Sequence, residues 1–212
     1  MFTGIIQHIG TVADMDTVRH RLEIQDSGVD RASRGDSISV NGVCLTLSSD
    51  VSSSATQPLS FRVLPETFRK SNLGLLSKGD RVNIETSLQA GHGIGGHFVT
   101  GHIDQTGEII RIQKSAYEYL LWIRVSTELL PLIAPKGSIA VNGVSLTVLD
   151  TNNDSFSVYL VEETRNSTNL TAMKEGDRLN IEADIFSRYI YNILGPGMNK
   201  SLTMEQLNAF GY

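Results

Sequence analysis

Two positions of this 212-residue chain place side chains capable of chemistry in otherwise almost identical surroundings, Cys44 and Ser145. Cys44 belongs to the octet Val-Asn-Gly-Val-Cys-Leu-Thr-Leu at residues 40–47, and Ser145 to Val-Asn-Gly-Val-Ser-Leu-Thr-Val at residues 141–148. A free cysteine is usually a small core residue. A hydroxyl at the equivalent position argues against that role, so the pair predicts pockets that carry a thiol in one copy and an alcohol in the other.

Three histidines, His92, His97 and His102, follow one another at intervals of five residues. An odd spacing on a strand sends successive side chains to opposite faces, and no cysteine or carboxylate cluster lies alongside, so no metal site is predicted. His102, between Gly101 and Ile103, is a candidate proton carrier in a pocket, with a hydrogen-bonded structural histidine as the alternative. The local spacing contains no Ser/His/Asp triad.

The glycine-rich stretch at residues 91–96, Gly-His-Gly-Ile-Gly-Gly, satisfies the pattern G-x-G-x-x-G. In dinucleotide-binding proteins a strand precedes this pattern and a helix begins in it, so that the helix N-terminus meets the pyrophosphate. Here β-branched and aromatic residues follow at 97–103. We therefore interpret the stretch as a linker between two domains.

The repeat that contains the octets extends along most of the chain. Gly-Asp-Arg-Val-Asn-Ile-Glu at residues 79–85 returns as Gly-Asp-Arg-Leu-Asn-Ile-Glu at residues 176–182, a displacement of 97 residues. Such self-similarity indicates a duplicated module. Each copy is long enough to bury its own core. We expect a first domain over residues 1–97, a second over residues 98–186 and a C-terminal tail over residues 187–212.

In both copies, short segments rich in β-branched and aromatic residues alternate with turn-forming Gly, Asp and Ser residues. The predicted strands are residues 4–14, 21–26, 36–40, 44–50, 59–64 and 81–87, then residues 102–114, 120–126, 138–141, 145–151, 155–160 and 178–184. We predict an all-β fold of two homologous six-stranded closed β-barrels in tandem, because closure removes exposed strand edges. A β-sandwich is the alternative.

Few helices are expected, and two of them lie outside the repeat. Residues 65–76 predict a short helix or turn. In the tail, helices are predicted over residues 187–194 and 202–210, separated by Gly-Pro-Gly at residues 195–197, which stops any helix. The second of these has a capping-box pattern at its start. A helical tail outside the repeat suggests an element for oligomer assembly.

The composition is that of an ordinary globular protein, with 40% apolar and 19% charged residues. The net charge of −5 comes without a basic run, which argues against nucleic acid as a partner. The single cysteine fits a reducing compartment, the N-terminus lacks a signal-peptide pattern, and no apolar stretch approaches the ~18 residues of a membrane helix. We expect a cytoplasmic protein without membrane contact.

Four motifs in this order closely resemble those of the riboflavin synthase family: residues 1–5, 41–46, 95–104 and 136–147. The resemblance extends to about residue 190. It implies two β-barrels that each bind one molecule of 6,7-dimethyl-8-ribityllumazine. The implied reaction transfers a four-carbon unit between the two molecules, giving riboflavin and 5-amino-6-ribitylamino-uracil, with neither cofactor nor metal.

A duplicated pocket has a purpose in such a reaction, because two copies of one substrate must meet in different roles. Two related pockets would replace a bimolecular encounter by a positioned one, and the Cys44/Ser145 difference would separate donor from acceptor. The resemblance also implies a homotrimer, a working site between the first barrel of one subunit and the second barrel of its neighbour, and lumazine synthase as a partner. The Gly-Pro-Gly at residues 195–197 departs from the family's trimer-forming C-terminal helix.

Site residues follow from the resemblance position by position. The implied catalytic set, with Phe2 and His97 close by, is Cys44, His102, Ser145 and Thr147. We expect a donor–acceptor chain joining Ser145, Thr147 and His102. The first substrate molecule would contact Gly4, Ile5, Ile6, Cys44, Leu45, Thr46, Arg62, Val63, Leu64, Pro65, Glu66 and Thr67. The second would contact Gly101, His102, Ile103, Lys136, Ser145, Leu146, Thr147, Tyr159, Leu160, Val161, Glu162, Glu163 and Thr164.

The main alternative is a non-catalytic accessory, since lumazine protein and its yellow fluorescent relatives share the implied fold but bind one chromophore without turnover. In this chain both Leu-Thr motifs, at residues 45–46 and 146–147, and both segments 2–4 and 101–103 are intact. These features favour the enzyme. A lipocalin-like carrier of another small molecule has only the β-barrel class in its favour.

Overall fold

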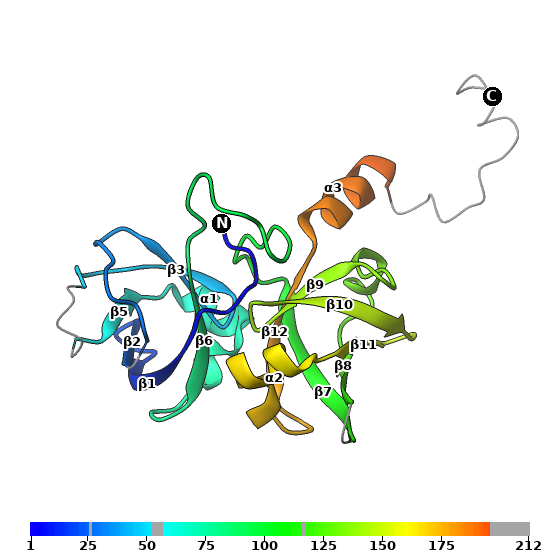
Figure 1. Ribbon diagram of the computed structural model, residues 1–212, viewed down its shortest axis with the longest axis horizontal. Coiled ribbons are helices and arrows are strands. Elements are labelled where there is room, and N and C mark those ends of the chain that lie inside the picture. The colour runs from blue at the N-terminus through cyan, green and yellow to red at the C-terminus, as the bar shows by residue number, and fades with distance from the viewer. Residues whose placement is uncertain (26, 52–56, 116–117, 196–212) are drawn as a thin grey trace, which may run out of the picture.

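A computed structural model describes residues 1–195 of the chain except residues 26, 52–56 and 116–117, and Figure 1 shows two β-structures side by side. Each contains six strands. Those of the first are β1 (His8–Asp16), β2 (Arg21–Gln25), β3 (Ser37–Val40), β4 (Val43–Thr46), β5 (Leu59–Arg62) and β6 (Arg81–Thr86). Those of the second are β7 (Gln105–Lys114), β8 (Tyr119–Arg124), β9 (Ser138–Val141), β10 (Val144–Thr151), β11 (Ser155–Tyr159) and β12 (Arg178–Ala183). Every predicted strand is present.

Both sheets are antiparallel and curl into barrels, which confirms the predicted fold class. The second sheet is a closed barrel in the order β10-β11-β8-β7-β12-β9. The first has the equivalent order β4-β3-β6-β1-β2-β5, and a bridge between Leu47 and Phe61 joins its two edges. The Ser48 amide donates to the Ser60 carbonyl across the same seam, 2.8 Å away. The β-sandwich alternative is therefore wrong.

Alternating side chains explain why each barrel closes around its own core. On β5, Leu59 and Phe61 are fully buried while Ser60 and Arg62 face outward, as the sequence pattern predicts. The two barrel interiors form separate apolar clusters. Burial of this kind is the main favourable term in folding, at roughly 25 cal/mol per Å² of apolar surface.

Short helices follow β5 and β11 at equivalent places. In the first module they are α1 (Pro65–Lys70) and the 3₁₀ helix η1 (Asn72–Leu75), within the predicted range 65–76. In the second they are α2 (Glu162–Ser167) and η3 (Asn169–Ala172), and another 3₁₀ helix, η2 (Leu130–Leu132), follows β8. Pro65 starts α1, where its missing amide costs no hydrogen bond.

The segment before each barrel differs from the prediction. Residues 4–7 and 102–104 were expected to begin strands, but β1 starts at His8 and β7 at Gln105. The residues ahead of these strands instead cross to the other barrel. Phe2 and Val99 exchange backbone hydrogen bonds of 2.8 and 3.1 Å, so the two crossing segments pair with each other between the barrels.

An amide cluster joins the two barrels. Its six buried side chains, called here the asparagine clasp, are Asn41, Asn72, Asn83, Asn142, Asn169 and Asn180. Asn72 Nδ2 donates to Asn142 Oδ1 (3.0 Å), and Asn169 Nδ2 donates to Asn41 Oδ1 (3.1 Å), which is the same contact with the barrels exchanged. Beside the clasp, a Cβ on Gly42 would lie 2.6 Å from the Gly143 amide nitrogen, so only glycine fits this approach.

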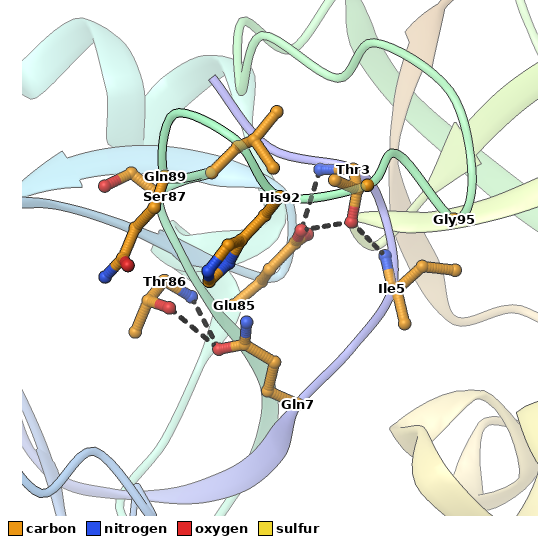
Figure 2. A pocket seen from close by; sticks show the side chains of 11 residues that line it. Thr3, Ile5, Gln7, Glu85, Thr86, Ser87, Gln89, His92 and Gly95 are labelled. Carbon is orange, nitrogen blue, oxygen red and sulfur yellow. Dashed lines mark hydrogen bonds between the residues drawn. The ribbon is translucent and has the colours of Figure 1, made fainter.

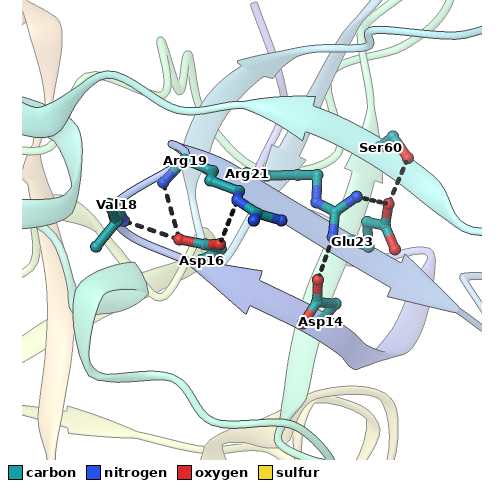
Figure 3. A network of polar contacts seen from close by, with 7 residues as sticks. All are labelled: Asp14, Asp16, Val18, Arg19, Arg21, Glu23 and Ser60. Atoms are coloured by element: carbon teal, nitrogen blue, oxygen red, sulfur yellow. Dashed lines mark hydrogen bonds and ion pairs between the residues drawn. The ribbon is translucent and has the colours of Figure 1, made fainter.

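The outer surface of the first barrel carries a polar network away from the barrel junction (Figure 3). Arg21 on β2 contacts Asp14 at 2.5 Å and Glu23 at 3.3 Å. The Asp16 carboxylate accepts from the amides of Val18 and Arg19 in the turn that follows β1. Each of these charged side chains is at least partly exposed, so each ion pair contributes little stability.

The helix α3 (Ile185–Leu194) leaves the second barrel after β12 (Figure 1). Asp184 caps it by accepting from the Phe186 amide, and Arg188 forms an ion pair with Asp104. The helix predicted over residues 187–194 is thus present, whereas the one predicted over residues 202–210 lies outside the described residues. None of the helices in the described part of the chain has the length and apolar character needed to cross a membrane.

Candidate functional site

Cys44 lies at the start of β4, in a pocket that both barrels build. Its backbone amide donates to the Gly101 carbonyl at 3.0 Å, and a Cβ on Gly101 would lie 2.5 Å from Cys44 Cβ. Ile103 of the same crossing segment packs against the core of the first barrel. The resulting hollow of about 170 Å³ is lined by Val43, Cys44, Glu66, Thr67, Lys70, Ser71, Gly101, His102 and Ile103.

Ser145 occupies the equivalent place on β10 and is held in the same way. Its amide donates to the Gly4 carbonyl at 2.8 Å, and a Cβ on Gly4 would lie 2.6 Å from Ser145 Cβ. Ile6 of that crossing segment belongs to the core of the second barrel. Each barrel thus receives the segment that precedes the other barrel's first strand.

A histidine is bonded to the hydroxyl in this second site. The Nδ1 atom of His97 lies 2.7 Å from Ser145 Oγ, and the His97 amide donates to the Thr3 carbonyl at 3.1 Å. Burial lowers the pKa of His97, with an opposing contribution from Asp184, so the imidazole is held neutral near pH 7. A neutral imidazole can accept the Ser145 proton or donate to the Ser145 oxygen, depending on its tautomer.

The crossing changes which predicted residues belong together. Within this chain, Gly4 to Ile6 lie against the second barrel and Gly101 to Ile103 against the first, which is the reverse of the predicted grouping. The predicted donor–acceptor series from Ser145 through Thr147 to His102 does not form within the chain either. His102 lines the hollow beside Cys44, and the Ser145 hydroxyl bonds to His97.

The other predicted site residues fall into three kinds of position. Buried ones are Phe2, Leu45, Val63, Leu146 and Leu160. Exposed ones at or near the ends of strands and the starts of α1 and α2 are Thr46, Arg62, Leu64, Pro65, Glu66, Thr147, Tyr159, Val161, Glu162 and Glu163, with Thr164 half-buried. Lys136 is exposed in the turn before β9, with a φ of 67°. Among these, Glu66 directly lines the Cys44 hollow.

A second hollow, of about 340 Å³, lies between the first crossing segment and the chain after β6 (Figure 2). Its lining includes Thr3, Ile5, Gln7, Glu85 and His92. Glu85 is 2% exposed, and burial raises its pKa against the opposing hydrogen bonds from Thr3 and Gly4. This hollow shares Ile5 with the predicted binding residues but contains neither Cys44 nor Ser145.

Sequence reasoning missed several residues that shape these sites. Lys70 and Ser71 line the Cys44 hollow, and Lys70 forms an ion pair with Glu66 at 2.8 Å. Glu85 and its counterpart Glu182 hold the crossing segments. Each glutamate is the last residue of the repeated heptad, at residues 79–85 and 176–182, and this repetition could have drawn attention to it. A glutamate on a strand is ordinarily exposed, however, so the sequence did not indicate its burial. Over the residues that the structure describes, no three His, Cys, Asp or Glu side chains gather to hold a metal ion.

Comparison with known families returns one description for both modules. The family described as "Lumazine binding domain" matches residues 3–87 and again residues 100–184. The two matches span the twelve strands of the two barrels.

Whole-chain relatives carry one enzyme name. The chain is 39% identical to the riboflavin synthase of Actinobacillus pleuropneumoniae and 36% identical to that of Bacillus subtilis (strain 168), in each case over 92% of this chain and 90% of the relative. It is 38% identical to the riboflavin synthase of Mycobacterium tuberculosis (strain ATCC 25618 / H37Rv), over 92% of this chain and 98% of the relative.

Solved structures of LumP have the same fold. LumP complexed with riboflavin superimposes with a TM-score of 0.76 at 22% identity, covering 86% of this chain and 99% of LumP. LumP complexed with 6,7-dimethyl-8-(1'-D-ribityl) lumazine gives a TM-score of 0.74 at the same identity and coverage.

Proposed function

Since this chain belongs to the riboflavin synthase family, with two lumazine-binding domains, we propose that it converts two molecules of 6,7-dimethyl-8-ribityllumazine into riboflavin and 5-amino-6-ribitylamino-uracil. One observation carries this proposal: Cys44 and Ser145 occupy equivalent places, and each is held by a glycine carbonyl from the opposite module. A transfer between two copies of one substrate needs two related but unlike sites. Two sites of this kind also position the reactants for each other.

The two sites supply different groups for the two roles. The reaction must remove a proton from the C7 methyl group of one lumazine and activate C7 of the other for attack. We assign proton transfer to the Ser145 side, where a neutral His97 lies 2.7 Å from the hydroxyl. On the other side Cys44 and His102 face the same hollow, and Thr147 completes the proposed catalytic set.

The crossing segments regroup the proposed contacts with substrate. One molecule is held by Cys44 to Thr46, Arg62 to Thr67 and Gly101 to Ile103. The other is held by Gly4 to Ile6, Lys136, Ser145 to Thr147 and Tyr159 to Thr164. This grouping follows from the hydrogen bonds Cys44–Gly101 and Ser145–Gly4.

Assembly is proposed to be a homotrimer, with α3 as its contact element. The helix exposes apolar and aromatic side chains, namely Phe186, Tyr189, Ile190, Tyr191, Ile193 and Leu194. An apolar face of this size on a helix that projects from its barrel is typical of an interface. The same proposal includes a domain boundary between residues 97 and 98 and a cytoplasmic location. It also includes a working site between neighbouring subunits and lumazine synthase as a partner.

The second candidate function is a flavin- or lumazine-binding accessory without turnover, which the similarity in fold to LumP favours. The deciding experiment incubates the purified chain with 6,7-dimethyl-8-ribityllumazine and follows riboflavin absorbance. The proposal expects one riboflavin for every two lumazines consumed, and no product from a Cys44→Ala/Ser145→Ala variant that remains folded. Binding with unchanged lumazine absorbance would instead support the accessory function.

A further inference from the structure

Two buried glutamates hold the crossing segments through matching sets of hydrogen bonds. Glu85 accepts from the Thr3 amide (2.7 Å), the Thr3 hydroxyl (2.7 Å) and the Gly4 amide (3.0 Å). Glu182 accepts from the Thr100 amide (2.7 Å), the Thr100 hydroxyl (2.7 Å) and the Gly101 amide (2.9 Å). Glu85 is 2% and Glu182 is 3% exposed, so these hydrogen bonds are shielded from water.

Each crossing segment also accepts one hydrogen bond from the barrel on the other side of the junction. The Gly4 carbonyl accepts from the Ser145 amide in the second barrel, and the Gly101 carbonyl accepts from the Cys44 amide in the first. Both glycines have positive φ, +75° and +81°, which few other residues adopt. The contact sequence is therefore glutamate, crossing segment, then the backbone amide of Cys44 or Ser145 in the opposite barrel.

We propose that Glu85 is a positioning residue for the Ser145 site of the second barrel, and that Glu182 is a positioning residue for the Cys44 site of the first. The contacts stand by themselves, whereas the role of these sites in substrate binding rests on the proposed function. Glutamine cannot replace either carboxylate, because its NH₂ group would face a backbone N–H where the second oxygen now accepts. Hydrogen bonds to an ionised acceptor are about twice as strong as neutral ones. Replacing the carboxylate by an amide therefore weakens the attachment of the whole crossing segment.

The state of charge of the two carboxyl groups is tied to the same contacts. Burial raises the pKa of Glu85 and Glu182, and the hydrogen bonds from Thr3 and Gly4, or from Thr100 and Gly101, oppose that shift. All three partners of each carboxyl group are donors, which matches the ionised form. Ionisation and a fixed crossing segment therefore support each other.

Cys44 is the chain's single cysteine, so its alkylation rate reports on one site without any need for turnover. We expect Glu182→Gln to raise the rate of Cys44 alkylation by iodoacetamide roughly tenfold, since loss of a charge-assisted hydrogen bond frees the segment packed on the thiol. The matched variant Glu85→Gln should leave that rate within about twofold of the unsubstituted chain. Where a glutamine variant does not fold, Thr100→Val and Thr3→Val test the same difference, because each removes the hydroxyl's bond to the glutamate and the bond that the hydroxyl accepts from the amide two residues later.

Moving the thiol tests the other half of the proposal. In a Cys44→Ser/Ser145→Cys background the single thiol lies in the second barrel, so Glu85→Gln should now raise the alkylation rate and Glu182→Gln should not. Equal acceleration by both glutamine variants in both backgrounds would mean general destabilisation and overturn the proposal, as would no acceleration in either. Because alkylation requires no substrate, its result is distinguishable from a failure of the proposed enzymatic function.

Discussion

The Cys44 site and the Ser145 site share a backbone plan but differ in what covers them. In both, a glycine carbonyl from the opposite module holds the amide of the central residue. The Ser145 hydroxyl is bonded to buried His97, whereas Cys44 faces a hollow with exposed His102. At the position equivalent to His102, the Ser145 site has Ile5, an apolar side chain. The two sites are thus chemically unlike although their scaffolds are nearly the same.

The order of the chain explains this difference. After β6 the chain must reach the second module, and on the way residues 95–98 fold over Ser145: a Cβ on Gly96 would lie 2.7 Å from Ser145 Cβ. After β12 the chain enters α3, which leaves the barrel, so up to residue 195 the chain provides no equivalent cover for Cys44. A duplicated module therefore becomes asymmetric because one copy is followed by a linker and the other by a helix.

The largest expected effect on turnover comes from removing one module. A fragment of residues 1–97 keeps Cys44 but lacks Gly101 and Ser145, so it has neither a held first site nor a second site. We expect no measurable riboflavin formation from this fragment. We also expect dimers, in which the Gly4 segment of one copy lies against Cys44 of the other, with analytical ultracentrifugation and lumazine fluorescence titration as the measurements. Full activity in a monomeric fragment would contradict the need for two unlike sites.

Next in size is the difference between the central residues themselves. Ser145→Ala should lower kcat by roughly 10²–10⁴-fold, the range typical of a positioned proton-transfer group, because it leaves His97 without its hydroxyl partner. Cys44→Ala should cost about tenfold or less, since thiol hydrogen bonds are weak. Lumazine dissociation constants and circular dichroism serve as controls for binding and folding. Equal, small losses from both variants would show that catalysis depends mainly on bringing the two substrates together.

The strands and the barrels could be predicted from the sequence because both are local in origin. Alternation of apolar and polar residues, as at residues 59–62, sets which face of a strand is buried, and the repeat doubled every such signal. The crossing of residues 2–6 and 99–103 could not be predicted in this way. An apolar residue such as Ile6 signals burial, but not that the core it enters belongs to the other barrel.

Candidate residue types could be selected from the sequence, but their contacts could not. Cys44 and His102 line one hollow, and Ser145 is not among its lining residues. The contact between Ser145 and His97 joins residues 48 positions apart through a glycine-rich linker. Linkers lack the periodicity from which a fold is inferred, so only the three-dimensional arrangement reveals that this one completes a site.

A smaller effect on turnover is expected at His97, whose lowered pKa also makes the stability of the fold depend on pH. His97→Gln keeps a hydrogen-bonding group beside Ser145, so kcat should fall by only about tenfold. Burial lowers the pKa of His97 below 6.5, which means that the unfolded chain takes up a proton at higher pH than the folded one. This contribution to stability is full above pH 6.5 and is lost as the pH falls through the lowered pKa.

Chemical denaturation at pH 7.5 and at pH 5.5 measures this dependence. The unsubstituted chain should lose more unfolding free energy between the two pH values than His97→Gln loses, because glutamine does not titrate. His102→Gln is the matched histidine-to-glutamine control, since His102 is exposed on the other site. If His97→Gln kept the pH dependence of the unsubstituted chain, the His97 imidazole would have to be accessible to protons in the folded state.

The smallest effect on turnover is expected where the two modules are alike, in the asparagine clasp. Asn72 Nδ2 donates to Asn142 Oδ1 and to the Arg178 carbonyl (3.1 Å), and Asn169 Nδ2 makes the exchanged contacts with Asn41 Oδ1 and the Arg81 carbonyl (3.0 Å). Asn72→Ala and Asn169→Ala should each lower the free energy of unfolding by about 1–3 kcal/mol, because each removes two buried hydrogen bonds across the junction.

Both losses should lie in this range, with the larger one for Asn72→Ala, because Asn72 Oδ1 also accepts from Asn180 Nδ2 (2.8 Å) whereas Asn169 Oδ1 has no hydrogen-bond partner among the described residues. At saturating lumazine, kcat should stay within about twofold of the unsubstituted chain, because the clasp touches neither Cys44 nor Ser145 and the crossing segments have their own anchors at Glu85 and Glu182. Urea denaturation and steady-state kinetics on the same preparations measure both quantities. A large fall in kcat from one alanine variant and not the other would mean that the asymmetry of the two sites extends through the clasp, and that the linker over Ser145 is not its only source.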